Sequence, residues 1–362
     1  MTIAITAFPG RYIQGPGVLR TASQEISKYG QKVLMIVDPF VAQNIWPENR
    51  CWFSDLEMET CIFGGECCEE EIEKVISRAA GSGSTVLAAM GGGKTIDTVK
   101  AAGERMDLPV IIIPTAASSD AACSAVAVIY TPDGEVEKVI KTRNNPRAVL
   151  MDTEIIVNAP VRLLIAGMGD ALATWFEADS VRRTNSTNVL GSMASRTAYY
   201  LARLCYETIT EYGVIAVKAC ETGCLTPAFE YIVEANTLLS GIGFESGGLG
   251  APHAIHNGLS ILPQSHHALH GEKVAFGLLA SLFLTGKEPD MIEKMYHLYG
   301  QLGLPTSFED LGMGTVSVEE LLAVGEATCI SGSNIYHENV PISARRVCDA
   351  LILADHYKKK TI

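Results

Sequence analysis

The sequence lacks the paired cysteines that mark small metal-binding or disulfide-rich scaffolds. Its ten cysteines include the neighbours Cys67 and Cys68, and Cys220 and Cys224 with three residues between them, but no Cys-x-x-Cys pair. Zinc ribbons and disulfide frameworks both depend on closely and regularly spaced cysteines. We therefore expect reduced thiols, most of them buried as small apolar side chains.

Long apolar segments and an excess of positive charge are also missing. The longest apolar runs, such as residues 274–284, are too short to cross a bilayer, and the N-terminus has no basic, apolar leader. The formal net charge of −13 disfavours nucleic acid and acidic membranes as partners. With 48% hydrophobic residues among 362, the chain can bury the cores of about two domains. A soluble, cytoplasmic protein is expected.

The first 160 residues alternate β-rich runs with helical patterns. Strand-like runs at 32–37, 85–89 and 110–113 are separated by helical spacing at 69–80 and 95–102. This alternation predicts a Rossmann-like parallel sheet with crossover helices, whose ligands lie at the carboxyl ends of the strands. From Val161 onward strand signals nearly vanish, which predicts an all-α domain over residues 161–362. A cleft between the two domains is the expected place for a small molecule.

A glycine turn, GGGKT at residues 91–95, lies between a predicted strand and a predicted helix. A Walker phosphate loop needs its first glycine at position 88, which is Ala88, and the dinucleotide fingerprint needs a third glycine where Ile96 stands. Neither motif is therefore present. Consecutive glycines still allow close approach to a ligand or a positive φ, and the N-terminus of a helix suits a phosphate. The turn is either a phosphate-binding turn or a tight connection without a ligand.

Histidines are concentrated in one segment, because five of the eight fall within residues 253–270. They are His253, His256, His266, His267 and His270, and they include two i, i+3 pairs that can each share a helix face. Two imidazoles from neighbouring helices are a usual start for a divalent metal site, which for a catalytic zinc needs a third protein ligand. Asp170 is the best carboxylate candidate, with a helix cap as its alternative role. No His-Glu-x-x-His motif is present, so a zincin protease is not indicated.

Five short motifs occur in a fixed order along the chain. They are GGGKTID (91–97), PTAASSDAACSA (114–125), GMGDALATWFEA (167–178), SGGLGAPHAIHNG (246–258) and HGEKVAFG (270–277). Each is weak alone, but the ordered set, within a match from Val37 to Gly277, resembles the iron-containing, or group III, alcohol dehydrogenase family. The resemblance implies a dehydroquinate synthase-like architecture, with an NAD-binding domain at 1–160 and a helical metal-binding and catalytic domain at 161–362.

The resemblance implies a metal held by Asp170, His253 and His270. Many iron-binding relatives add a histidine four residues beyond the aspartate, and Thr174 stands there in this chain. Three protein ligands fit the zinc-type members better, so we expect Zn²⁺ rather than Fe²⁺. His256 is then close to the metal without binding it, and His266 and His267 are bystanders or indirect contacts.

The resemblance also implies that NAD is the cofactor. The matching positions are Gly92, Gly93, Lys94, Thr95 and Asp97 at the pyrophosphate, Thr115 and Ser118 in the next loop, and Ser124, Val126 and Tyr130 beside the nicotinamide. Asp38 matches the adenosine-ribose position, where a carboxylate favours NAD over NADP. Asp120 matches a substrate contact, and Asp120 and His256 are the candidate catalytic groups for proton transfer.

The activity that the resemblance implies is oxidation of glycerol and related vicinal diols at the secondary hydroxyl. Dihydroxyacetone is the expected product, the metal is the Lewis acid, and hydride passes to C4 of the nicotinamide. Relatives are often octamers, so a homo-oligomer is expected.

Other functions make different demands on the sequence. A lyase resembling 3-dehydroquinate synthase, or a dehydrogenase of a phosphorylated polyol, needs cationic side chains, and no Lys or Arg lies between Phe244 and His270. Another group III enzyme with a different alcohol substrate stays open. A P-loop kinase lacks its first glycine, and a non-catalytic metal scaffold leaves the glycine turn unexplained.

Overall fold

The computed structural model describes residues 3–358, which form two compact units. The sheet unit comprises Ala7–Leu163 and Ala219–Gly241, and the helical unit comprises Leu164–Lys218, residues 242–358 and the described part of residues 1–6. One crossing of the chain, between residues 163 and 164, lies close to the predicted boundary at 160, whereas residues 219–241 return to the sheet unit. The assignment of NAD to one domain and metal to the other stays a prediction.

Six parallel strands form the main sheet, in the order β1-β8-β5-β4-β2-β3. Their bounds are β1 Tyr12–Gly15, β2 Lys32–Val37, β3 Glu57–Ile62, β4 Val86–Gly91, β5 Val110–Pro114 and β8 Ala148–Asp152. Every residue of β4, β5 and β8 is buried, as expected of a parallel sheet covered on both faces. The predicted parallel sheet is therefore confirmed.

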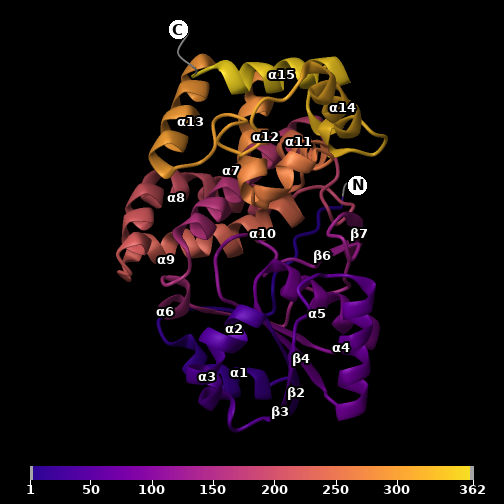
Figure 1. Ribbon diagram of the computed structural model, residues 1–362, viewed down its shortest axis with the longest axis vertical. Coiled ribbons are helices and arrows are strands. Elements are labelled where there is room, and N and C mark those ends of the chain that lie inside the picture. Colours follow the sequence, from indigo (N-terminus) through magenta and orange to yellow (C-terminus); the bar gives the residue numbers. More distant parts are fainter. Residues whose placement is uncertain (1–2, 359–362) are drawn as a thin grey trace. The chain divides into compact units, whose positions relative to one another are not determined.

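Helices cover this sheet because alternate side chains point to opposite faces. Val33, Met35 and Val37 of β2 share one core cluster with residues of α1 and the short helices near it. The longer helices α4 and α5 pack against each other and contact β2 and β4 (Figure 1). The helices of this region are α1 Ala22–Ser27, α2 Pro39–Asn44, α3 Trp46–Asn49, α4 Glu69–Ser82, α5 Gly93–Met106 and α6 Thr153–Ile156.

The strand order reverses between β2 and β4. From β2 the chain continues to β3 on one side, and from β4 it continues to β5 on the other. Ligands of open α/β sheets bind at the carboxyl ends of strands that flank such a reversal. Asp38 follows β2 and its amide donates to the carbonyl of Met90 at 3.0 Å, so Asp38 and the glycine turn after β4 meet at this point.

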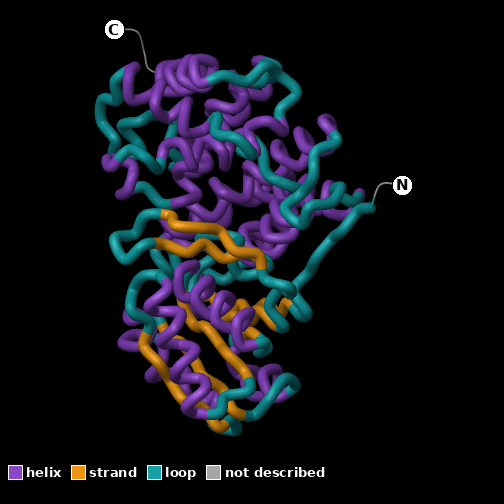
Figure 2. Tube along the Cα trace, turned by 90° about the vertical axis from the view of Figure 1, so that its right-hand side faces the viewer, coloured by secondary structure: helices purple, strands orange, loops and turns teal. Residues whose placement is uncertain are grey.

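Two further features complete the sheet unit. β6 (Val126–Tyr130) and β7 (Val136–Lys141) form a separate antiparallel pair, visible apart from the main sheet in Figure 2. Helix α9 (Pro227–Glu234) and the π-helical turn Ala235–Leu239 also belong here, although they lie far along the chain. Nothing in the sequence pattern indicated this return.

The helical unit contains the helices that carry the histidine cluster. Among the described residues from 161 onward there is no strand beyond an isolated bridge at Met193, which confirms the all-α prediction. Helix α11 contacts α12 and α14, and α12 contacts α15. The helices are α7 Val161–Thr184, α8 Arg196–Glu221, α11 Ala251–Leu259, α12 His270–Leu284, α13 Pro289–Leu302, α14 Val318–Thr328 and α15 Ala344–His356; the end of α8 and the start of the short helix α10 (Ser240–Ile242) belong to the sheet unit. Within residues 3–358, no helix combines the length and apolar character needed to span a membrane.

Candidate metal centre and cofactor turn

Two glycines bring α7 and α12 into close contact beside the predicted metal ligands. A Cβ on Gly169 would lie 2.6 Å from the carbonyl oxygen of Gly271, and a Cβ on Gly271 would collide with the carbonyl of Ala166. Backbone this close requires glycine at both crossing positions. Asp170 follows the first glycine and His270 precedes the second, so the crossing sets these two side chains next to each other.

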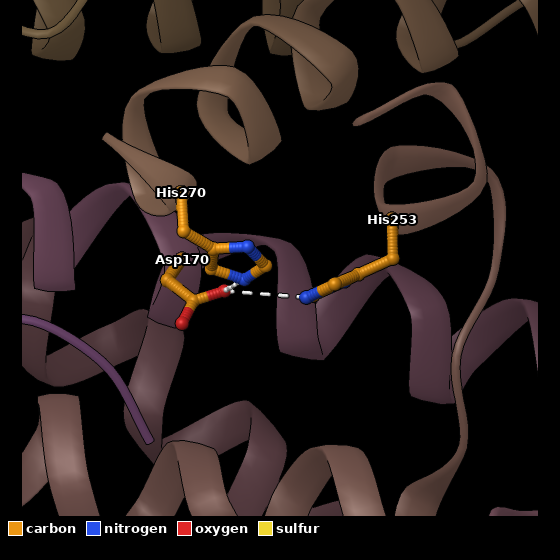
Figure 3. A group of neighbouring side chains, drawn as sticks. All are labelled: Asp170, His253 and His270. Carbon is orange, nitrogen blue, oxygen red and sulfur yellow. Dashed lines mark ion pairs between the residues drawn. The ribbon is translucent and has the colours of Figure 1, made fainter. Parts of the chain in front are cut away.

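The cluster itself consists of Asp170, His253 and His270, as predicted (Figure 3). The Asp170 Oδ1 atom lies 3.2 Å from His253 Nε2 and 3.3 Å from His270 Nε2. Asp170 is 1% exposed and lies well inside α7, nine residues after its first residue Val161, so it is not a helix cap. One potential ligand atom from each residue falls within 4.8 Å of the others.

The donor set fits a divalent cation. Neither oxygen of the buried Asp170 carboxylate makes a well-directed hydrogen bond among the described residues, where its ion-pair partners are the imidazoles of His253 and His270. Two ligands on a tetrahedral zinc at about 2.1 Å lie about 3.4 Å apart, close to the two N–O distances here. Two imidazoles and one carboxylate are also a donor set that zinc uses in catalytic sites. The residues therefore fit the metal that the family implies.

Charges within the cluster shift its acid–base properties. Burial by itself would raise the pKa of Asp170, but the imidazoles of His270 and His253 outweigh it and hold this pKa well below its usual range. Burial disfavours a charged His253, yet Glu177 and Asp170 raise its pKa well above the ordinary value. The carboxylates of Asp170 and Glu177 therefore favour positive charge on the His253 imidazole.

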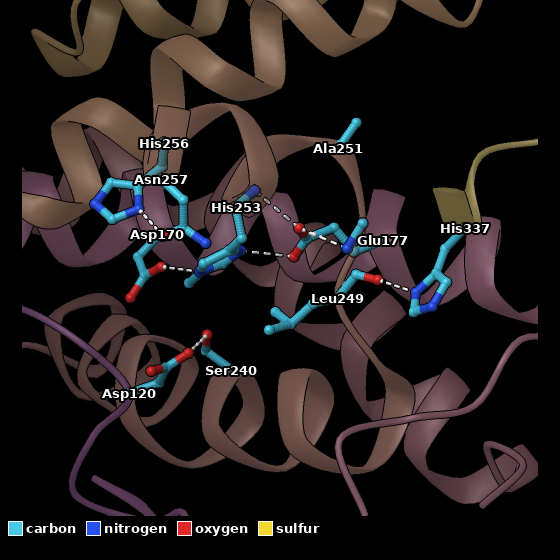
Figure 4. Close-up of polar contacts among 12 residues, drawn as sticks. Asp120, Asp170, Glu177, Ser240, Leu249, Ala251, His253, His256, Asn257 and His337 are labelled. Atoms are coloured by element: carbon cyan, nitrogen blue, oxygen red, sulfur yellow. Dashed lines mark hydrogen bonds and ion pairs between the residues drawn. The ribbon is translucent and has the colours of Figure 1, made fainter. Parts of the chain in front are cut away.

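Two further side chains contact the ligand histidines, and Figure 4 shows the first of them, Glu177, beside His253. Glu177 is fully buried, and its Oε2 lies 2.9 Å from His253 Nδ1. His256 Nε2 lies 3.1 Å from His270 Nδ1, which places His256 beside the cluster as predicted. Sequence reasoning missed Glu177, although the signal was present: it stands seven residues after Asp170, so both side chains share one helix face.

A cationic side chain also lies near the cluster. Lys273 of α12 is buried, and its Nζ donates to Ser260 Oγ at 3.0 Å. Burial lowers the pKa of His256, and His270 and Lys273 lower it further. The segment from Phe244 to His270, which has no Lys or Arg, is thus followed three residues later by a buried lysine. Sequence spacing alone did not show that this lysine lies near His256.

The glycine turn leaves open space where a ligand could approach. The turn forms the start of α5, with Gly92 as its N-cap residue. A Cβ on Gly92 would have no atom within 4 Å, whereas one on Gly91 would lie 2.8 Å from the Cβ of Asp38. None of the three glycines has a positive φ, so close approach rather than backbone conformation accounts for them. Free backbone amides beside open space fit a pyrophosphate.

Several charged residues predicted to bind the cofactor already have partners inside the protein. Asp97 Oδ2 accepts from the amide of Val128 at 3.0 Å, and Oδ1 lies 2.9 Å from the buried Lys100 ammonium. Lys100 also donates to the carbonyls of Ala121, Ser124 and Val126. Asp97 and Lys100 together therefore hold the 121–128 segment in place through hydrogen bonds to its backbone.

The remaining residues predicted to bind the cofactor belong to the same sheet unit. Asp38 Oδ1 accepts from the amide of Phe40 and caps α2, which leaves its second oxygen for another donor. Lys94 pairs with Glu66 at 2.5 Å and lies over the ring of Tyr130. Thr95 is buried beneath Gly91, and Thr115 and Ser118 are half-buried in the loop after β5.

Ser124, predicted beside the nicotinamide, and Asp120, predicted to contact substrate, differ in their hydrogen bonding. The hydroxyl of Ser124 is buried and has no hydrogen-bond partner among the described residues, and Val126 begins β6. Asp120 is 9% exposed and accepts from Ser240 Oγ at 2.9 Å. An unsatisfied hydroxyl in the sheet unit is a further observation that fits a polar ligand. The roles of all these residues stay predictions.

Comparison with known proteins places the chain in a family. Residues 9–153 match the family described as iron-containing alcohol dehydrogenase. A glycerol dehydrogenase of Thermotoga maritima is 50% identical over 356 residues, which cover 98% of each chain. A glycerol dehydrogenase of Escherichia coli is 42% identical, with 97% of this chain and 96% of the relative covered.

Solved structures agree with this assignment. The crystal structure of glycerol dehydrogenase from Schizosaccharomyces pombe superposes with a TM-score of 0.94 at 38% identity, and the match covers 99% of this chain and 92% of that one. The two-part architecture predicted from the sequence is thereby confirmed. The chain belongs to the iron-containing alcohol dehydrogenase family.

Proposed function

We propose that the chain is an NAD-dependent oxidoreductase that oxidises glycerol and related vicinal diols at the secondary hydroxyl, with dihydroxyacetone as the product from glycerol. The observation that carries this proposal is the convergence of Asp170, His253 and His270, in which a fully buried carboxylate faces the ring nitrogens of both histidines. Full-length relatives that are glycerol dehydrogenases support the substrate class.

Asp170, His253 and His270 would hold the metal that takes part in oxidation of the alcohol. A divalent metal, Zn²⁺ in our proposal, would act there as a Lewis acid that lowers the pKa of the secondary hydroxyl. Asp170 contributes a fixed negative charge, and Glu177 holds the His253 ring in place. With three protein ligands, a catalytic zinc keeps a position open for substrate.

Residues of the sheet unit bind and orient the nicotinamide cofactor in this proposal. Backbone amides at Gly92 and Gly93 would bind the pyrophosphate, and the second oxygen of Asp38 would accept from the adenosine ribose. Oxidation also releases a proton from the substrate hydroxyl. Asp120 and His256 are the candidates to accept it, and each already contacts a polar neighbour, Ser240 or His270.

The runner-up is a lyase like 3-dehydroquinate synthase, and the buried Lys273 is the one feature that could favour it. An anionic substrate needs several free cations, whereas the Lys273 ammonium already donates to Ser260 and burial lowers its pKa. A neutral polyol makes no such demand. The near full-length identity to glycerol dehydrogenases also favours oxidation.

The test measures NADH absorbance after the metal has been removed with a chelator and restored as Zn²⁺ or Fe²⁺. Glycerol and 1,2-propanediol should give NADH with restored zinc, and 1-propanol should give much less. No NADH with any diol would contradict the proposal. Activity with 1-propanol and iron alone would assign the chain to another branch of the family. The expected octamer and cytoplasmic location stay predictions.

A further inference from the structure

Glu177 makes contacts that link the start of α11 to one ligand histidine. Its Oε1 accepts from the amides of Gly250 at 3.0 Å and His253 at 3.1 Å, and its Oε2 lies 2.9 Å from His253 Nδ1. The side chain is fully buried on α7, on the helix face that it shares with Asp170. A single carboxylate therefore contacts both the backbone and the imidazole of His253.

These contacts determine which nitrogen of His253 carries hydrogen. The carboxylate of Glu177 accepts two amide hydrogens and can only accept at Oε2 as well, so Nδ1 must be the donor. In a neutral imidazole, Nε2 then carries the lone pair, and this is the atom that lies 3.2 Å from Asp170 Oδ1. Ligand histidines commonly donate their second ring nitrogen in this manner, which fixes the tautomer and the ring orientation.

We propose that Glu177 is a positioning residue for the metal centre, acting through His253 by fixing its metal-binding tautomer and ring orientation. This inference rests on the proposed metal-dependent function. It assigns a role to a residue seven positions from Asp170 whose hydrogen bonds go to Gly250 and His253.

A second buried carboxylate provides a matched control. Glu338 accepts from the amide of Ala251 at 2.9 Å and from Ser180 Oγ at 2.6 Å. Like Glu177, it satisfies a free amide at the start of α11, where negative charge is favourable. No contact between Glu338 and an imidazole is found among the described residues. The two glutamates thus share the helix-stabilising role and differ in the histidine contact.

The experiment compares Glu177→Gln with Glu338→Gln in competitive Zn²⁺ titrations against a chromophoric chelator. The side-chain amide that Glu177→Gln introduces can donate to His253 Nδ1 and so favours the wrong tautomer. We expect Glu177→Gln to weaken zinc binding about 10- to 100-fold, and Glu338→Gln to stay within about threefold of wild type. The absorption bands of the Co²⁺-loaded Glu177→Gln protein should also shift, because ligand geometry changes, while those of Glu338→Gln should not.

A double-mutant cycle tests whether Glu177 acts through His253. In the His253→Ala background, adding Glu177→Gln should cause no further loss of zinc affinity. If Glu177→Gln does not fold, neutron diffraction from the zinc-loaded wild-type protein should still locate a deuteron on His253 Nδ1. The inference would be overturned by equal losses of zinc affinity in Glu177→Gln and Glu338→Gln, by unchanged zinc affinity in Glu177→Gln, or by a His253 Nδ1 without a deuteron. Each of these outcomes would leave the proposed function standing. Wild-type protein that binds no divalent ion would overturn the proposed function as well.

Discussion

At the metal cluster a fully buried carboxylate is paired with imidazoles that are themselves candidate metal ligands, whereas at the glycine turn the charged side chains are paired with lysine, glutamate or a backbone amide. Asp170 is paired with the imidazoles of His253 and His270, while Asp97 is held by Lys100 and the amide of Val128. The glycine turn instead offers backbone amides and open space to a ligand, since a Cβ on Gly92 would have no atom within 4 Å. The two regions are therefore prepared for different ligands.

This difference matches the chemistry of the two ligands. A metal ion needs side-chain donor atoms in fixed positions, here one carboxylate and two imidazoles. A pyrophosphate binds to backbone amides at a helix N-terminus, which requires little more than close approach. Substitutions in the helical unit should therefore act on metal binding, and those at the turn on cofactor binding or on stability of the sheet unit.

The largest effect is expected from Asp170→Asn. Loss of the carboxylate should remove bound zinc and reduce NADH production at least about 10³-fold, since Lewis-acid catalysis contributes several kcal/mol. The metal-free variant should be less stable than metal-free wild type, because the imidazoles of His253 and His270 lose the carboxylate that pairs with them. Elemental analysis and thermal unfolding measure the two outcomes. Stoichiometric zinc in this variant would show that the ligand set is wrong.

Lys100→Met should mainly destabilise the protein. The substitution leaves Asp97 buried without its ammonium partner, which typically costs about 3–5 kcal/mol of the free energy of unfolding. Lys94→Met is the matched control, since its ion pair is exposed and contributes about 1 kcal/mol or less. Urea denaturation measures both changes, and zinc content should be unchanged in each. Similar stability of the two variants would argue against the supporting role of Asp97 and Lys100.

Gly91→Ala and Gly92→Ala separate close packing from ligand space. At Gly91 the new Cβ would lie 2.8 Å from Asp38, so the free energy of unfolding should fall by about 1–3 kcal/mol. At Gly92 stability should hardly change, but the KM for NAD should rise roughly tenfold, because a methyl group would occupy the space assigned to the pyrophosphate. An unchanged KM for NAD in Gly92→Ala would show that the cofactor does not occupy the space beside Gly92.

The smallest effect concerns the pH dependence of stability. Burial raises the pKa of Glu338 above its ordinary value of 4.5, although hydrogen bonds from Ser180 and Ala251 oppose the shift. A raised pKa in the folded state means that its stabilising contribution is present below about pH 4.5 and is lost as pH rises through the folded-state value. Glu338→Gln should therefore gain stability relative to wild type between about pH 4.5 and 7 in urea denaturation. A constant difference across this range would exclude the shift.

Much of this organisation could be predicted from the sequence. Alternating strand and helix patterns indicated the parallel sheet, and histidine spacing with the resemblance indicated the three residues that converge. Local patterns could not show that Asp97 and Lys100 hold the 121–128 segment, because that contact depends on tertiary packing. They also could not show the return of residues 219–241 to the sheet unit. Glu177 was within reach, since its position seven residues after Asp170 repeats the helix face.

The most direct test is an anomalous-difference map at the zinc edge from crystals of the zinc-loaded protein. We expect one strong peak per chain, at about 2.0–2.2 Å from an Asp170 carboxylate oxygen and from the Nε2 atoms of His253 and His270. A peak bound by other residues, or an active enzyme without a peak at this position, would contradict this expectation.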